Sequence, residues 1–320
     1  MIRWYFSWVL LFALSCSGYS QQWPVHSQYM LNKYRDNPAY GGLERSLSVF
    51  SSYRDQNNGL NGKPRTLFIG MAMPVYVWSG AAGITFYNQK AGTFSDNNIK
   101  ASYNYVLGTS YGFLSFGGRL GLNITQVNSS GIITPDGDYE GNINHNDPFI
   151  DNNNFGGVGL SWELGTYFYG TDIEAGLMVA ELPDHTNSLG NGRYTRRFTS
   201  ALFAQYKFRI LDDVRISPSI MLRVDNAVIQ SDIGAYARWN QTLLFGFNLR
   251  GYNTNSLDAC ALIAGTNIGD RYFLTYSYEF GLSALRSYHQ GSHEIMLSYN
   301  LQKLIGIGLP PGIIYNPRDL

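Results

Sequence analysis

The chain has 320 residues, of which 44% are hydrophobic and 14% charged, and its 23 basic and 23 acidic side chains balance to zero net charge. This balance removes the electrostatic basis of nucleic-acid binding, so we expect no nucleic-acid partner. The low charged fraction argues against an ordinary soluble enzyme. Beyond the N-terminus, no run reaches the roughly 18 to 20 apolar residues that a membrane-spanning helix needs.

The N-terminus has the features of a secretory signal peptide. Arg3 precedes an apolar run over residues 4–14, and small residues follow it. We therefore expect residues 1–20 to be removed on export. Cys16 leaves the alternative of a lipoprotein open. If Cys16 is removed, Cys260 is the only cysteine of the mature chain, and no internal disulfide forms.

Residues 21–45 lack the alternation of a strand. They contain His26-Ser27-Gln28-Tyr29-Met30 and, further on, Asn37-Pro38-Ala39-Tyr40-Gly41-Gly42. Two interpretations stay open, because the segment could fold into the lumen of a barrel as a plug or remain a mobile periplasmic leader.

From residue 46 to residue 302, apolar and polar side chains alternate with the period of a β-strand. In residues 114–124 the even positions are apolar or glycine, whereas the odd positions include Ser115, Arg119 and Asn123. Many of these segments reach about ten residues, enough for a tilted strand to cross a bilayer. The pattern predicts fourteen strands, near 46–54, 64–74, 78–88, 97–109, 111–126, 155–170, 171–181, 197–210, 213–225, 228–238, 241–252, 258–267, 270–282 and 291–302.

The connections support a membrane barrel. Those after even-numbered strands are short, whereas most of those after odd-numbered strands are long, at 55–63, 89–96, 127–154, 182–196 and 283–290. The exception is the tight connection at 226–227. Because bacterial outer-membrane barrels have short periplasmic turns and long external loops, we predict an all-β, antiparallel transmembrane β-barrel in contact with outer-membrane lipid.

Aromatic residues near the predicted strand ends suggest an interfacial girdle. The candidates are Tyr76, Trp78, Tyr87, Tyr111, Tyr167, Tyr169, Trp239, Tyr252 and Tyr272.

Three stretches resemble a known family. They are HSQYMLNKYRDNPAYGG at 26–42, YRDQNNGLNGKPRT at 53–66 and GSHEIMLSYNL at 291–301. They are similar to the PorP/SprF family of outer-membrane proteins of the type IX secretion system, with the resemblance spanning Gln28 to Leu301. The resemblance implies a non-enzymatic barrel that helps to export or hold surface proteins, such as gliding adhesins. Its implied partners are this cargo and components of the secretion or gliding machinery.

The same stretches supply candidate residues for binding a plug or a partner. Arg54 and Gln56 end the first predicted strand, and both side chains carry several hydrogen-bonding groups. Adjacent strand residues point to opposite faces, so His293 and Glu294 are not expected to act together. The candidates are Gln28, Tyr29, Asn37, Pro38, Arg54, Gln56, Pro64, Arg65, His293 and Glu294.

Two motifs suggest chemistry that their context does not support. Gly108-Thr109-Ser110-Tyr111-Gly112 matches the G-x-S-x-G elbow, but a strand rather than a helix follows it, so we predict a hairpin turn. Residues 136–147, DGDYEGNINHND, match a calcium loop at several positions but end in Asp147 where a glutamate is expected. We expect no catalytic residues, no cofactor and no metal centre, with calcium at this loop left open.

Three functions fit such a barrel: an accessory of secretion and attachment, a diffusion channel for small solutes, and a lipid-modifying enzyme. The resemblance favours the first. Residues 303–320 form a Gly/Pro-rich periplasmic extension, for which docking on a periplasmic component and terminal disorder both stay open.

Overall fold

The computed structural model describes residues 25–75, 78–140, 143–147, 150, 154–181, 185–189, 192–225, 228–252 and 256–305. The predicted signal peptide and most of the C-terminal extension lie outside the described residues. So do Tyr76 of the predicted girdle and the tight connection at 226–227. No helix within the described residues has the length and apolar character needed to cross a membrane.

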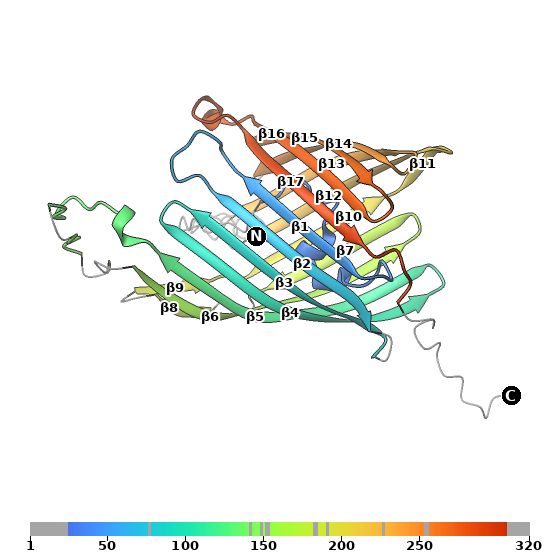
Figure 1. Ribbon diagram of the computed structural model, residues 1–320, viewed down its shortest axis with the longest axis horizontal. Coiled ribbons are helices and arrows are strands. Elements are labelled where there is room, and N and C mark those ends of the chain that lie inside the picture. Colours follow the sequence, from blue (N-terminus) through green and yellow to red (C-terminus); the bar gives the residue numbers. More distant parts are fainter. Residues whose placement is uncertain are drawn as a thin grey trace, which may run out of the picture.

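The strands form one closed antiparallel barrel (Figure 1). They are β1 (Ser48–Asp55), β2 (Arg65–Val75), β3 (Gly80–Ala91), β4 (Phe94–Thr109), β5 (Gly112–Val127), β6 (Phe155–Gly170), β7 (Ile173–Ala180), β10 (Thr199–Tyr206), β11 (Phe208–Leu211), β12 (Val214–Asp225), β13 (Val228–Trp239), β14 (Leu243–Tyr252), β15 (Ser256–Ile268), β16 (Tyr272–Gly281) and β17 (Ser292–Asn300). A separate hairpin joins β8 (His185–Leu189) and β9 (Gly192–Arg196). The short helices are α2 (Lys33–Asp36), η1 (Pro38–Tyr40), η3 (Ser129–Gly131) and η4 (Ala284–Ser287).

The first and last strands pair with each other and close the barrel. Ser48 of β1 lies opposite Ala72 of β2 on one side and Asn300 of β17 on the other. The segments β10 and β11 both pair with β12 and form a single strand that is interrupted at Lys207. The barrel therefore has fourteen strands, as the sequence predicted.

Most of the short turns that the structure describes lie at one end of the barrel, called here the short-turn end, and the long connections lie at the other, the long-loop end, together with one tight turn. One long loop expected from the sequence, at 89–96, is instead a tight turn, because β3 and β4 continue until Ala91 lies opposite Phe94. The polar residues that the sequence suggested to be a loop instead form hydrogen bonds between these two strands. Asn88 Nδ2, for example, donates to Asn97 Oδ1 at 2.7 Å. Gly92, at φ +58°, makes the turn.

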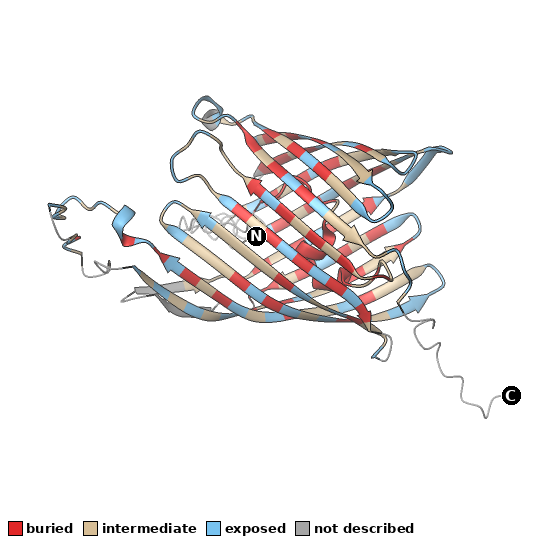
Figure 2. Ribbon diagram, viewed as in Figure 1, coloured by how far each residue is buried: buried red, intermediate tan, exposed pale blue. Residues whose placement is uncertain are grey.

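Burial alternates along most of the long strands (Figure 2), and many of the exposed positions carry large apolar side chains. On β5, Leu120 is 60% exposed, whereas its neighbour Arg119 is 4% exposed and points into the lumen. This is the reverse of a soluble protein, and it places the apolar face against lipid and the polar face around the lumen.

The girdle prediction is only partly right. Trp78, Tyr111 and Trp239 are exposed near the short-turn end, as an interfacial girdle requires. Tyr167, in contrast, is 1% exposed and packs inside the lumen. Tyr87 and Tyr169 also pack against the buried core, because they occupy lumen-facing positions of their strands.

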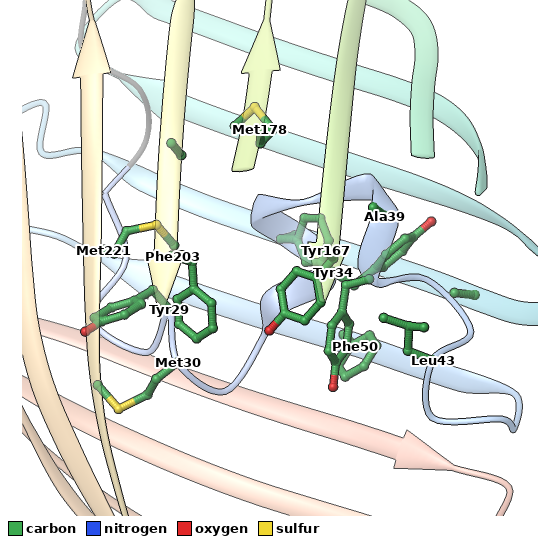
Figure 3. Packing of buried hydrophobic residues seen from close by; sticks show 14 of the residues in the cluster. Tyr29, Met30, Tyr34, Ala39, Leu43, Phe50, Tyr167, Met178, Phe203 and Met221 are labelled. Carbon is green, nitrogen blue, oxygen red and sulfur yellow. The ribbon is translucent and has the colours of Figure 1, made fainter. Parts of the chain in front are cut away.

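The lumen holds a core formed by an N-terminal segment, residues 25–46, which we call the plug. Its apolar side chains pack against lumen-facing residues of the strands, as Figure 3 shows for Tyr29 beside Phe203 and Met221. The rings of Tyr29 and Phe203 meet edge to face, with centroids 6.1 Å apart. Residues far apart in the sequence thus share one core inside the barrel.

Candidate functional site: a plug held by a ring of charges

Short local motifs shape the plug. Asn32 caps α2, its side-chain oxygen accepting from Arg35 N at 3.3 Å. Asn37 caps η1 in the same way, accepting from Ala39 N at 2.9 Å, and Pro38 begins that helix. These caps turn the chain sharply, so that its side chains reach several walls of the barrel.

Hydrogen bonds fasten the first described residues of the plug to the wall. Gln28 Nε2 donates to Ser277 Oγ at 3.1 Å and to the Glu294 carbonyl at 3.0 Å, and Thr275 donates to Gln28 Oε1. The Tyr29 hydroxyl donates to the carbonyl of Ser219, 3.1 Å away. Both residues are fully buried, so each polar group needs such a partner.

Eight buried charges form a closed ring around the plug. On the barrel wall, Glu294 contacts Arg54 (3.3 Å), Arg54 contacts Glu279 (2.7 Å), Glu279 contacts Arg250 (2.7 Å), Arg250 contacts Asp232 (2.9 Å) and Asp232 contacts Arg223 (3.4 Å). The plug completes the ring, because Asp36 contacts Arg223 (3.2 Å), Arg35 contacts Asp36 (3.3 Å) and Arg35 contacts Glu294 (3.5 Å). We call these eight residues the charge ring.

The charge ring is electrically balanced, with four guanidinium groups alternating with four carboxylates. None of its residues is more than 7% exposed. Buried charges are tolerated when each is paired, and removal of one partner typically costs about 3–5 kcal/mol. The charge ring therefore favours one position of the plug over all others.

The backbone next to the charge ring is tied in as well. Ser27 N donates to Glu294 Oε2 at 2.8 Å, and its hydroxyl donates to Glu279 Oε2 at 2.6 Å. His26 Nδ1 lies 3.8 Å from Glu294 Oε1. Burial, followed by the positive charge of Arg35, holds the pKa of the His26 imidazole well below its usual value.

Two further charge clusters hold the rest of the plug. Glu163 accepts from Lys100 at 2.8 Å and from Arg119 at 2.7 Å, and Arg119 also donates to the Arg35 carbonyl at 3.2 Å. Nearer the short-turn end, Glu174 at the start of β7 pairs with Lys33 of the plug and with Lys207. The plug is thus anchored along its length.

Glycines of the wall make room for the plug. A Cβ on Gly117 would lie 2.7 Å from Ala39 Cα and 2.8 Å from Ala39 N. A Cβ on Gly165 would lie 2.2 Å from the side-chain oxygen of Asn37. At these two positions glycine is needed because the plug backbone and its capping residue approach the wall so closely.

The structure brings some of the candidate residues together. Gln28, Arg54 and Glu294 meet at the charge ring, with Arg54 Nη1 donating to Ser27 Oγ at 2.7 Å. Tyr29 lies against another part of the wall, formed by β12 and β13. Asn37 Nδ2 bonds the carbonyls of Thr166 (3.0 Å) and Leu177 (3.1 Å), with Pro38 following it.

The other candidates lie away from the plug. Gln56 and Pro64 pair through their backbones at the long-loop end, with 2.9 Å between Gln56 N and the Pro64 carbonyl. Arg65 is exposed, with its Nε 3.8 Å from Asp55. His293 faces outward, where its Nδ1 lies 2.7 Å from the Tyr276 hydroxyl.

The candidate residues predicted from the sequence include only two members of the charge ring, Arg54 and Glu294. All four of the missing wall residues lie within predicted strands. Arg223 and Glu279 have apolar neighbours on both sides, whereas Asp232 and Arg250 have one apolar neighbour each. Charged residues at such positions must face the lumen, so the alternation marked them as interior charges. Arg35 and Asp36 carried no comparable signal.

The G-x-S-x-G match at 108–112 and the calcium-like loop at 136–147 form a turn and a surface loop of the barrel. Ser110 lies in the two-residue turn between β4 and β5, as predicted, and no helix follows it. In the 136–147 loop, Asp138 and Asn144 form an isolated bridge, and the Asp138 carboxylate accepts from Glu140 N at 3.0 Å. Within the described residues, no group of three or more His, Cys, Asp or Glu could hold a metal. Gly141 of this loop lies outside the described residues.

The family model described as type IX secretion system membrane protein PorP/SprF matches residues 18–299. No curated protein sequence matches the chain. Among solved structures, the toluene transporter TbuX of Ralstonia pickettii is 13% identical, with a TM-score of 0.51 over 83% of this chain and 92% of that chain. The toluene transporter TodX of Pseudomonas putida is 11% identical, with a TM-score of 0.45 over 84% and 93%. Omp33 of Acinetobacter baumannii is 8% identical, also at 0.45, over 80% and 96%. The likeness to TbuX shows a shared barrel fold.

Proposed function

The chain belongs to the PorP/SprF family of type IX secretion system membrane proteins, and we propose that it is an outer-membrane accessory of that system. Its role in this proposal is the export or surface attachment of secreted proteins, such as gliding adhesins. The proposal includes export through the signal peptide at residues 1–20 and contact with components of the secretion or gliding machinery.

The plug is the observation that carries this proposal. A barrel whose lumen holds its own N-terminal segment, fixed by the charge ring, presents its loops and its short-turn end to other molecules. Loops on a rigid scaffold are common binding surfaces. The long connections would face the cell exterior and meet the cargo, and the short-turn end would face the periplasm and the machinery.

A display assay tests the role. In a strain of the source bacterium lacking this gene, a reporter fused to a type IX C-terminal signal domain should disappear from the surface, as measured by protease treatment of intact cells. The gene supplied in trans should restore the reporter. A surface protein exported by another route serves as the control and should stay in place. Unchanged display of the type IX reporter in the deletion strain would refute the proposal.

A diffusion channel is the alternative function, and it needs a continuous path through the lumen. Fourteen strands enclose room for such a path only where the interior is unfilled. With the plug in place, we expect the purified protein to give little or no steady current in planar bilayers. A large, steady single-channel current from the unmodified protein would favour the channel instead.

A further inference from the structure

Between the plug and the short-turn end lies a cavity of about 480 Å³, which we call the vestibule. Met30, Leu31, Lys33 and Tyr40 of the plug line its inner end. Asp270 and Arg271, next to the turn before β16, line its mouth. Its volume falls in the range typical of ligand pockets, about 300–1,000 Å³.

Two arginines, Arg215 and Arg238, lie side by side on the wall of this cavity. In the strand register, Arg209 of β11 is directly opposite Arg215 of β12, and Arg215 is directly opposite Arg238 of β13. Residues directly opposite in an antiparallel pair have Cβ atoms about 4.5–5.5 Å apart, and like charges at such positions destabilise the sheet. Arg215 and Arg238 line the vestibule, together with Arg271.

These arginines differ from those around the plug in their lack of carboxylate partners. Arg35, Arg54, Arg119, Arg223 and Arg250 each form an ion pair. Within the described part of the chain, Arg209, Arg215, Arg238 and Arg271 form none within 4.0 Å. Arg238 instead lies over the ring of Phe273, with its Cζ 4.7 Å from the centroid.

Carboxylates are present nearby but do not pair with these arginines. Asp212 and Asp213 line an adjoining recess of about 150 Å³ together with Arg215 and Arg238. Glu174 lines the vestibule but is already held by Lys33 and Lys207. The guanidinium groups of Arg215 and Arg238 are therefore available to an anion that comes from outside the chain.

We propose that the vestibule binds a carboxylate-bearing peptide segment of a periplasmic partner, with Arg215 and Arg238 as the groups that hold the carboxylates. The planar guanidinium matches a carboxylate in a bidentate manner. The cavity is larger than one small anion needs, and it is also lined by Tyr236, Gln241 and Tyr299, whose side chains can bond a peptide backbone. The inference rests on the proposed function only in assigning the short-turn end to the periplasm.

The test uses the full chain in detergent and a fluorescently labelled hexaglutamate peptide, with binding followed by fluorescence anisotropy. The double variant Arg215→Gln/Arg238→Gln should weaken binding by roughly tenfold or more, because it removes both guanidinium contacts to the carboxylates. The matched control is Lys90→Gln/Arg286→Gln, which removes the same charge at the long-loop end and should bind like the wild type. If the double variant does not fold, Arg271→Gln takes its place and should also weaken binding.

Several outcomes of the binding experiment would overturn the proposal. Absence of peptide binding to the wild type, or equal weakening in both double variants, would overturn the assignment. Inorganic phosphate that competes as well as unlabelled peptide at equal charge would show a general anion site and would overturn the peptide assignment. Failure of the proposed function would appear in the display assay alone, because binding in detergent does not depend on secretion. Since like charges are removed, the melting temperature of Arg215→Gln/Arg238→Gln should stay equal or rise.

Discussion

Asp36 of the plug and Arg223 of β12 form an ion pair across 187 residues of sequence, with 3.2 Å between Oδ1 and Nη2. Asp36 is 4% exposed and Arg223 is 3% exposed. Through this contact and that of Arg35 with Glu294, the plug closes a ring of charges that the wall alone leaves open. Withdrawal of the plug would break both contacts and leave Arg223 and Glu294 each with one partner fewer.

The Asp36 contact predicts a large stability effect. Asp36→Asn should lower the free energy of unfolding by about 3–5 kcal/mol, because Arg223 and Arg35 would each lose a buried carboxylate partner. Urea unfolding in detergent micelles, followed by tryptophan fluorescence, measures this change. The control is Asp55→Asn at the long-loop end, where Asp55 is more exposed and pairs with Lys63. Its effect should be about 0–1 kcal/mol. Equal losses in the two variants would contradict the role assigned to the charge ring.

Adjacent glycines of β5 test the fit of the plug. Gly117→Ala would press a methyl group against the Ala39 backbone at 2.7 Å, and we expect a loss of roughly 1–3 kcal/mol together with displacement of the plug. Gly118→Ala is the matched control, since its Cβ would meet Leu164 at 3.4 Å, an ordinary contact. Limited proteolysis at the plug and current in planar bilayers report displacement. Identical behaviour of the two variants would refute the close fit.

The alternation of side chains along the strands was enough to predict the barrel and much of its interior. It turns Arg119 inward and Leu120 outward, and the same rule applied to β6 turns Ser161, Glu163 and Tyr167 inward. Tyr167 was assigned to a girdle because it lies near a strand end. The odd or even position of a residue along its strand decides whether its side chain points inward or outward, and its distance from the strand end does not.

The closure of the charge ring was not predictable in this way. Arg35 and Asp36 both belong to α2, a helix of four residues. Such a helix is too short for a periodic pattern in the sequence to indicate the direction of its side chains. Their partners lie on β17 and β12, and only the three-dimensional path of the plug brings them together. The vestibule arginines are a similar case, because their adjacency depends on the strand register and not on their spacing in the sequence.

The outward face of β5 predicts sensitivity to depth in the membrane. Leu120→Arg places a charge near the middle of a sixteen-residue strand and should cost about 2–4 kcal/mol of folding free energy in lipid vesicles. Tyr111→Arg, in the exposed turn before that strand, should cost only about 0–1 kcal/mol. Folding into vesicles of a single phospholipid, measured over a urea series, compares the two. A larger cost at Tyr111 would show that the bilayer does not cover the middle of β5.

The plug histidine predicts a pH dependence with a defined sign. His26 lies outside the membrane-spanning strands, and burial together with Arg35, Arg54, Arg223 and Arg250 holds the pKa of its imidazole well below 6.5, despite the nearby Glu294 carboxylate. In the unfolded chain the imidazole takes up a proton near pH 6.5, so the unfolded state binds more protons below that pH. Stability is therefore unaffected by His26 above about pH 6.5 and falls as the pH decreases further.

Replacement of the histidine isolates this contribution. His26→Gln keeps a polar side chain but cannot titrate, so its melting temperature in detergent should fall less than that of the wild type between pH 7.5 and pH 5.5. His293→Gln is the control, because it replaces a histidine that lies outside the plug, on the outer face of β17, and leaves His26 in place. The fall in melting temperature seen in the wild type should persist in this variant. The range stays above pH 5 so that ordinary carboxylates, with pKa values near 4, contribute little to the difference. The same slope in all three proteins would mean that protonation of His26 does not oppose the plugged state.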